Sequence, residues 1–222
     1  MPKEIDYLGN IKFVGSTTIS QSTLTSSSNL VSSLGTVQTK ININNLNNTE
    51  NASYIGEINF NDFNLGGLAK SERLGTITAT LEVEGIGFSK KSLDAKVSGV
   101  INSFIFENYN YQNITLSGNF KNPLFDGLLV IDDPNLNLEF KGLVDISEEL
   151  NRFDFNAKIE FAELKQLNIV KRDSISIFAG KVDMEMIGND LNTLFGAISF
   201  KETFYQNEID NFYFNDFEIT SY

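Results

Sequence analysis

Acidic side chains are the most abundant groups in this sequence that can take part in chemistry. The 222 residues include 29 Asp and Glu against 17 Lys and Arg, with no His and no Cys. Glu82 and Glu84, and likewise Asp183 and Glu185, are carboxylates two residues apart, and paired carboxylates can act as acid and base. Both pairs alternate with apolar residues, which places the carboxylates on the solvent-facing side of a strand. We therefore interpret them as solvated charges.

The remaining inventory gives no support for catalysis or metal binding. Without Cys or His, the chain has no thiolate or imidazole ligands, no disulfides and no His-based catalysis. The Asp132-Asp133-Pro134-Asn135 block lacks the spaced oxygen ligands and final Glu of an EF-hand, and Asp-Pro-Asn is typical of a turn. No Gly-x-Ser-x-Gly elbow or Ser-Lys pair activates a serine. We predict a protein that is not an enzyme and has no metal and no cofactor.

The charge balance limits the possible partners. A net charge of -12 and a pI near 4.4 argue against binding to nucleic acid, whose backbone repels acidic proteins. The same charge argues against docking of the polar surface on anionic membranes. No run of 18 apolar residues is long enough to span a bilayer as a helix, and the first four residues do not resemble a signal peptide.

The elements that carry these charges follow a period of two, most clearly between Asn135 and Phe161. Apolar residues alternate with polar ones up to Ile146, and the alternation restarts at Phe153 after a polar turn at 147–151. This pattern predicts an antiparallel hairpin with one apolar and one charged face. The Ser/Thr/Asn-rich run at 16–51 interrupts the pattern, and we expect either an exposed edge or a floppy insertion there, with a strand around Ile41.

The same order of patterns occurs twice, in approximate repeats at 54–118 and 155–222. In each repeat an alternating strand leads into a short helical candidate, 65–73 in the first and 162–171 in the second. Across Gly180 the apolar parity changes, which predicts a β-bulge at that glycine. A period near 100 residues predicts stacked modules that share one sheet, so we expect residues 1–222 to form a single elongated region.

Three stretches carry a resemblance to a known family: GFSKKSLDAKVSG at 87–99, FIFENYNYQNITLSG at 104–118, and LFDGLLVIDDPNL at 124–136. They resemble the periplasmic repeat region of TamB-family proteins of Bacteroidetes, the translocation and assembly module proteins grouped with AsmA-like and bridge-like lipid transfer proteins. The resemblance covers the chain from about Tyr54 onward. It implies an all-β fold: an elongated, curled antiparallel sheet called a β-taco, with a U-shaped hydrophobic groove and one or two short helices.

The resemblance also implies a role. A periplasmic segment of an inner-membrane-anchored protein would carry phospholipid acyl chains between the two membranes, supporting outer-membrane biogenesis and protein translocation and assembly. Its partners would be an outer-membrane barrel assembly protein and flanking repeats of the same chain. The family's N-terminal membrane helix and C-terminal domain are missing from this sequence, so we expect an internal fragment.

The predicted lipid-binding groove is lined by the apolar side chains that alternate with polar ones along the strands. Its residues are Leu136, Leu138, Phe140, Val144, Ile146, Phe153, Phe155, Ile159, Phe161, Ile175, Ile177, Val182, Met184 and Met186. Alternatives stay open: the Phe-rich face forms the core of a closed sandwich, or the chain is a β-sandwich or β-helix adhesion module of a surface protein. The cargo is either lipid or a nascent outer-membrane protein.

Overall fold

A computed structural model describes residues 9–89, 91–121, 124–146, 150–189 and 193–221 of the chain. It contains strands β1 (Lys12–Ile19), β2 (Thr23–Ser32), β3 (Gly35–Asn44), β4 (Ser53–Asn64), β5 (Leu74–Ile86), β6 (Asp94–Phe106), β7 (Tyr109–Lys121), β8 (Leu124–Asp133), β9 (Leu136–Asp145), β10 (Arg152–Glu163), β11 (Ser176–Ile187), β12 (Phe195–Asn207) and β13 (Asn211–Ser221), and helix α1 (Leu65–Ala69). The predicted all-β class is confirmed.

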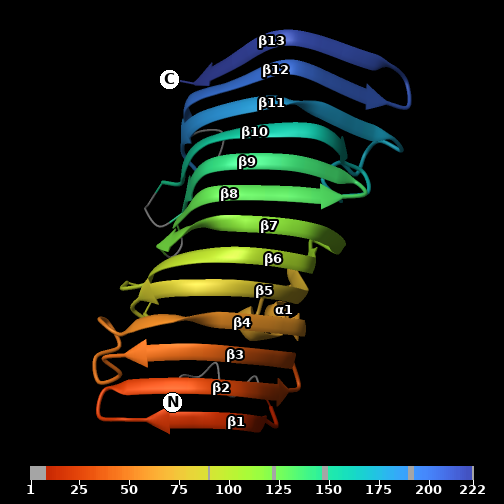
Figure 1. Ribbon diagram of the computed structural model, residues 1–222. Helices are drawn as coiled ribbons and strands as arrows, with labels where there is room; N and C mark the ends of the chain where they lie inside the picture. The colour runs from red at the N-terminus through yellow and green to blue at the C-terminus, as the bar shows by residue number, and fades with distance from the viewer. Residues whose placement is uncertain (1–8, 90, 122–123, 147–149, 190–192, 222) are drawn as a thin grey trace. The chain divides into compact units, whose positions relative to one another are not determined.

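The strands follow one another in chain order within a single sheet of 13 strands (Figure 1). Neighbouring strands pair antiparallel, for example β4 with β5 and β10 with β11. Within the described ranges every strand belongs to this sheet, so no second sheet packs on it as in a sandwich. The chain divides into two compact units, which we call unit 1 (up to Ser117) and unit 2 (from Gly118).

Unit 1 has its core where α1 meets the sheet. Phe63, Ile77 and Ala79 are buried there, and Leu65 and Leu68 of the helix pack against them. The Asn64 side chain caps the helix by accepting a hydrogen bond of 2.8 Å from the Gly67 N–H. The helix ends at Lys70, which has a left-handed backbone, and is therefore shorter than the predicted range of 65–73.

The polar run at 16–51 forms regular strands, so the prediction of a floppy insertion is wrong. Hydroxyl groups that face the same way on β1, β2 and β3 bond to one another across the strands. Thr17 Oγ1 lies 2.9 Å from Ser26 Oγ, Ser26 Oγ lies 3.4 Å from Ser28 Oγ, and Ser28 Oγ lies 3.0 Å from Thr39 Oγ1. These mutual bonds allow a sheet to form with few apolar residues at its centre.

In unit 2, two strands on either side of β11 contain an extra residue. β10 gains one between Ile159 and Ala162, and β12 gains one opposite the segment that contains Gly180. The bulge predicted at Gly180 is therefore misplaced, because β11 itself continues without an insertion. The predicted turn at 147–151 lies partly outside the described residues.

The second predicted helix, at 162–171, does not form. Ala162 and Glu163 end β10, and the residues after them form turns. One helical turn closes with a 3.1 Å bond from Leu167 N to Glu163 O, but Asn168 then takes a left-handed backbone and stops it. Among the described residues, no helix is both long and apolar enough to cross a bilayer.

Candidate functional site

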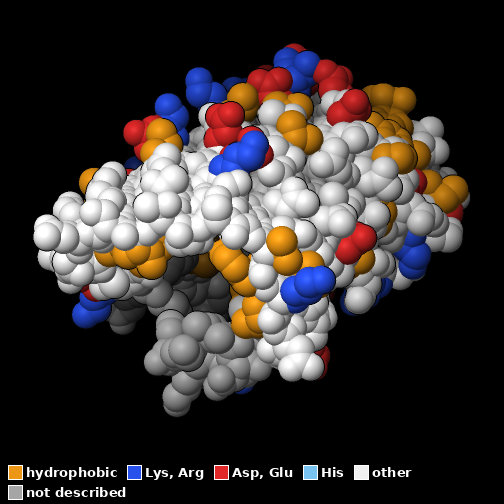
Figure 2. Space-filling model, turned by 60° about the horizontal axis from the view of Figure 1, so that its bottom comes forward, with side chains coloured by type: hydrophobic (Ala, Val, Ile, Leu, Met, Phe, Trp, Pro, Cys, Tyr) orange, Lys and Arg blue, Asp and Glu red, His pale blue; other side chains and the backbone are white. Residues whose placement is uncertain are grey.

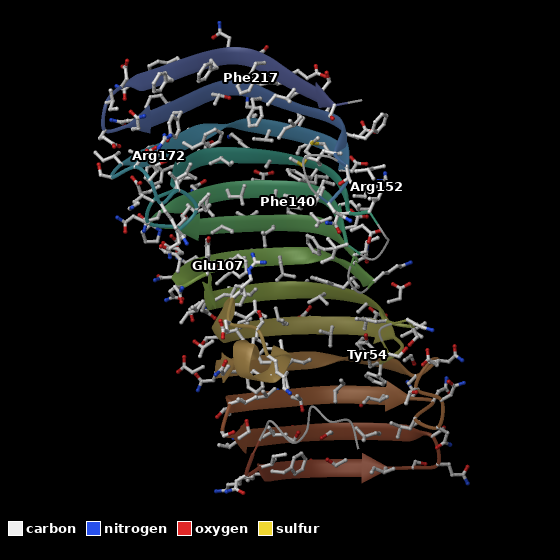
Figure 3. The ribbon with its side chains drawn as sticks, turned by 180° about the vertical axis from the view of Figure 1, so that it is seen from behind. Tyr54, Glu107, Phe140, Arg152, Arg172 and Phe217 are labelled. Atoms are coloured by element: carbon white, nitrogen blue, oxygen red, sulfur yellow. The ribbon has the colours of Figure 1, made fainter. Side chains whose placement is uncertain are left out.

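One face of unit 2 carries apolar side chains that line up from strand to strand. In its central row, the residues directly opposite one another from β8 to β13 are Leu129, Phe140, Ala157, Val182, Phe200 and Phe217. We call the face to which this row belongs the apolar face of unit 2. Figure 3 looks onto it, with Phe140 and Phe217 labelled. No polar residue interrupts the row over six strands.

The neighbouring row explains how aromatic rings fit on this face. It contains Gly142, Phe155, Met184, Ile198 and Ile219 in adjacent strands. The Phe155 ring lies 4.9 Å from the Phe140 ring, measured between centroids. A Cβ added at Gly142 would come within 2.3 Å of the Asp154 carbonyl oxygen and 2.5 Å of Phe155 Cα. Glycine is therefore required at this position, where the backbone of β10 lies too close for a side chain.

The opposite face of the same strands is charged and hydrated. Lys201 Nζ lies 2.7 Å from Asp183 Oδ2, and Lys181 Nζ lies 2.8 Å from Glu202 Oε2. Hydrogen bonds from Lys201 and then Asn156 lower the pKa of Asp183. Such exposed ion pairs add little stability. Their charges make this the solvent-facing side of the sheet. Figure 2 shows Lys, Arg, Asp and Glu side chains along the upper margin of that view, with hydrophobic side chains among them.

Most of the predicted groove residues lie on the apolar face of unit 2. They are Leu136, Leu138, Phe140, Val144, Phe153, Phe155, Ile159, Val182, Met184 and Met186. These residues lie on one face because side chains alternate without interruption along β9, the first half of β10 and the second half of β11.

Two predicted groove residues, Phe161 and Ile177, face away from this side of the sheet, and two others, Ile146 and Ile175, lie outside the strands. Phe161 lies opposite Asn137, because the extra residue in β10 moves it to the charged face. Ile177 is opposite Glu163 and out of phase with Phe178, so it too faces away. Ile146 follows the end of β9 and Ile175 precedes β11, and their side chains are 51% and 41% exposed.

Sequence reasoning also missed several aromatic residues of the apolar face: Phe125, Phe178, Phe200, Phe212, Phe214 and Phe217. The alternation of Phe212 and Phe214 was a signal for the first half of β13. Phe217 is out of phase with them in sequence, but its ring lies 5.6 Å from that of Phe214 and 4.6 Å from that of Phe200. An irregularity near Glu202 and Asn215 reverses the alternation of side chains within β13. The aromatic residues of both halves of the strand therefore lie on one face.

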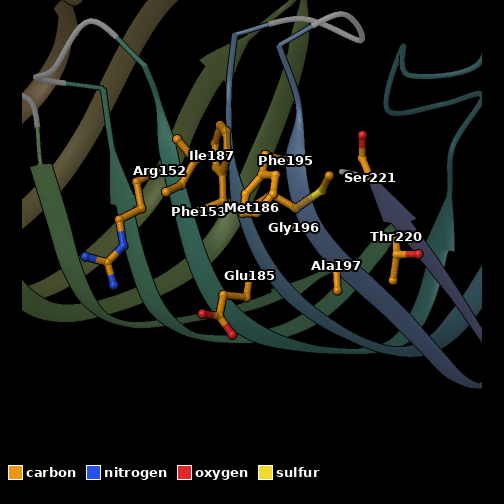
Figure 4. Close-up of a pocket in the computed structure, with 10 residues that line it drawn as sticks. All are labelled: Arg152, Phe153, Glu185, Met186, Ile187, Phe195, Gly196, Ala197, Thr220 and Ser221. Atoms are coloured by element: carbon orange, nitrogen blue, oxygen red, sulfur yellow. The ribbon is translucent and has the colours of Figure 1, made fainter.

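Among the described residues of unit 2, two hollows lie at opposite ends of its last strands. The first, of about 380 Å³, is lined by Arg152, Phe153, Glu185, Met186, Ile187, Phe195, Gly196, Ala197, Thr220 and Ser221 (Figure 4). The second, of about 470 Å³, lies on the apolar face and is lined by Arg172, Phe178, Phe200, Thr203, Tyr205, Asn207, Phe212, Phe214 and Phe217. We call the second one the aromatic hollow. Its size falls within the range of small-molecule sites.

The polar end of the aromatic hollow is built from residues of the loop before β11, of β11 and of β12. The Asp173 carboxylate accepts bonds from Arg172 Nε at 2.5 Å, Arg172 Nη2 at 3.1 Å and the Tyr205 hydroxyl at 2.9 Å. Ser176 Oγ, which is fully buried, lies 3.2 Å from the Tyr205 oxygen. These bonds, from Arg172 first and Tyr205 second, lower the pKa of Asp173.

The Asp132–Asn135 block forms a turn. Asp133 Oδ1 accepts a bond of 2.8 Å from the Asn135 N–H, and Asp132 Oδ1 accepts one from the Asn137 amide at 3.3 Å. Across the described ranges, no three Asp, Glu, His or Cys side chains cluster as a metal site would require. Comparisons of the chain with protein-family models, with curated proteins and with solved structures found no match.

Proposed function

We propose that this chain is a periplasmic segment of a bridge that carries phospholipid between the inner and outer membranes, with its acyl chains held on the apolar face of unit 2. The observation that supports the proposal is the apolar row from Leu129 to Phe217, which no second sheet covers within the described residues. A sheet that leaves such a face open to water loses the stabilisation that burial would bring. A ligand with a long hydrocarbon chain restores it.

The dimensions of the face suit an acyl chain. Strands about 4.8 Å apart place the first and sixth residues of the row about 24 Å from each other. The acyl chains of one leaflet span half of a hydrocarbon core of about 30 Å, or about 15 Å. The row is therefore long enough to hold an extended acyl chain. Each Å² of apolar area that leaves water stabilises the bound lipid by about 25 cal/mol. Because no residue of the row is polar, an acyl chain has no desolvation cost to overcome along it.

The membrane context of the proposal comes from the resemblance to the TamB family. The stretches at 87–99, 104–118 and 124–136 carry that resemblance. It adds an inner-membrane anchor, flanking repeats of the same chain and an outer-membrane barrel assembly protein as the partner. Outer-membrane biogenesis, with protein translocation and assembly, is then the process that the lipid flow supports.

The test is site-specific photocrosslinking in cells that express the full-length protein. A photoreactive residue at Phe140 or Phe155 should capture phospholipid, which mass spectrometry of the purified adduct identifies. The matched controls are Asn156 and Lys158, which lie in the same strand as Phe155 and point to the charged face.

Capture from both faces alike, or from neither face in a folded protein, would contradict the proposal. Capture of an unfolded outer-membrane protein at Phe155 in place of lipid would also contradict it and would assign the face to a protein client. Phe155→Asp provides a second test, because a charge in the path of the acyl chains should stop transport. Circular dichroism of that variant establishes that the sheet still forms.

A further inference from the structure

The loop between β10 and β11 has a local charge opposite to that of the chain. Lys165, Lys171 and Arg172 lie within eight residues of one another in a protein whose net charge is -12. The loop is held in place, since Leu167 is 1% exposed and Lys165 Nζ donates a 2.9 Å bond to the Lys171 carbonyl oxygen. These cations are therefore presented by an ordered segment at one end of the strands, where Figure 3 labels Arg172.

Arg172 is the cation of this loop that lines the aromatic hollow. Its Nε and Nη2 atoms donate bonds to the buried Asp173 carboxylate, which also accepts a bond from the Tyr205 hydroxyl. The Arg172 side chain is nevertheless 82% exposed, and Nη1 has no bonding partner among the described residues. Asp173 thus fixes one edge of the guanidinium group and leaves the other edge directed to solvent.

The floor of the hollow next to this cation is aromatic. The Phe200 and Phe217 rings stack at 4.6 Å between centroids, and the Tyr205 and Phe212 rings lie 6.2 Å apart. Phe212, Phe214 and Phe217 are each more than a third exposed. A fixed cation at the rim of an uncovered aromatic surface is complementary to an anionic head joined to a hydrocarbon chain.

We propose that the aromatic hollow is a headgroup-reading site for phospholipid: Arg172 binds the phosphodiester, and the acyl chain lies on Phe178, Phe200 and Phe217. This inference rests on the proposed function and adds to it the class of lipid and the orientation of its head. A guanidinium group suits a phosphodiester because two parallel N–H groups reach two of its oxygen atoms.

The experiment measures binding of fluorescent lipids to the purified chain, with phosphatidylglycerol as the anionic lipid and diacylglycerol as the same lipid without a head. Arg172→Gln should weaken phosphatidylglycerol binding about tenfold and leave diacylglycerol binding unchanged. Arg152→Gln is the matched control. Arg152 also pairs with an aspartate, Asp154, at 3.1 Å, but it lies at the other end of β10, away from the aromatic hollow.

The outcomes separate the two proposals. If the wild-type chain binds neither lipid, the proposed function fails. If it binds both and Arg172→Gln changes nothing, or acts no differently from Arg152→Gln, the lipid face stands and the headgroup site is overturned. If inorganic phosphate displaces phosphatidylglycerol at equal concentration, the site recognises a free anion and the inference is wrong. Equal thermal melting of the variants and the wild type shows that they fold.

Discussion

Asp173 illustrates how a single residue organises the polar end of the aromatic hollow. Its carboxylate is nearly inaccessible to water and accepts bonds from both Arg172 and Tyr205. These bonds favour the ionised form and lower its pKa, which outweighs the opposing effect of burial. A group with a lowered pKa in the folded state links stability to pH.

The first prediction concerns this linkage. Between the lowered pKa of folded Asp173 and the value of about 3.9 for an unfolded aspartate, the unfolded chain binds the extra proton. The stabilisation is therefore present above pH 4 and is lost as the pH falls through the folded pKa. Asp173→Asn should remove this component, so urea denaturation should show the variant losing less stability than the wild type between pH 5 and pH 3, where the limits are about one unit either side of the unfolded value.

The comparison of the two proteins is needed because Asp183 and Glu202 also have lowered pKa values. Their contributions are present in both proteins and cancel in the difference. An identical pH dependence of the wild type and Asp173→Asn would show that the bonds from Arg172 and Tyr205 contribute no net stability.

At the scale of an element, the hydroxyl groups of β1, β2 and β3 replace the apolar contacts that the other strands use. Ser28 lies opposite Thr39, and the two oxygen atoms are 3.0 Å apart. Both side chains are partly buried, and a hydroxyl removed from water without a partner costs more stability than the bond itself contributes. The pair should therefore be coupled.

The second prediction is a double-mutant cycle on this pair. Thr39→Val should lower the free energy of unfolding by about 1 kcal/mol, because Ser28 keeps its hydroxyl and loses this partner. Ser28→Ala together with Thr39→Val should be less destabilising than the sum of the single variants, since the bond between the two residues is lost only once and Ser26 keeps its 2.9 Å bond to Thr17. Urea denaturation measures all four proteins. Additive effects would show that the two hydroxyl groups act independently.

At the scale of the whole molecule, the first and last strands of the sheet each have a neighbour on one side only. Unpaired strand edges tend to associate with other chains. Asp216 and Glu218 lie on the charged face of β13, where Lys201 of β12 is opposite Asp216. Two copies that pair antiparallel through β13 would bring these acidic residues together, and their repulsion opposes the association.

The third prediction follows from that repulsion. Asp216→Asn with Glu218→Gln should increase self-association of the purified chain, measured by sedimentation velocity over a range of protein concentrations. Glu82→Gln with Glu84→Gln is the control, because it makes the same change in net charge on β5, an internal strand. If the two double variants associate equally, the effect is one of net charge and does not involve the edge of β13.

What the sequence by itself determined is the class of the fold and the side of each regular strand that is apolar. Leu136 to Val144, Phe153 to Ile159 and Val182 to Met186 were placed on one face because side chains alternate along an extended backbone. The turn at Asp133-Pro134-Asn135 was equally local, since the bond from the Asn135 N–H to the Asp133 carboxylate joins residues two positions apart.

What only the tertiary structure decided depends on pairing between strands. An extra residue in β10 moved Phe161 to the charged face, and the irregularity near Glu202 brought Phe214 and Phe217 together. A bulge adds one residue and has no composition of its own, so the alternation of the sequence does not reveal it. The bond between Asp173 and Tyr205 likewise joins residues 32 positions apart. It exists because β11 and β12 are neighbours, and no local preference of either residue specifies that pairing.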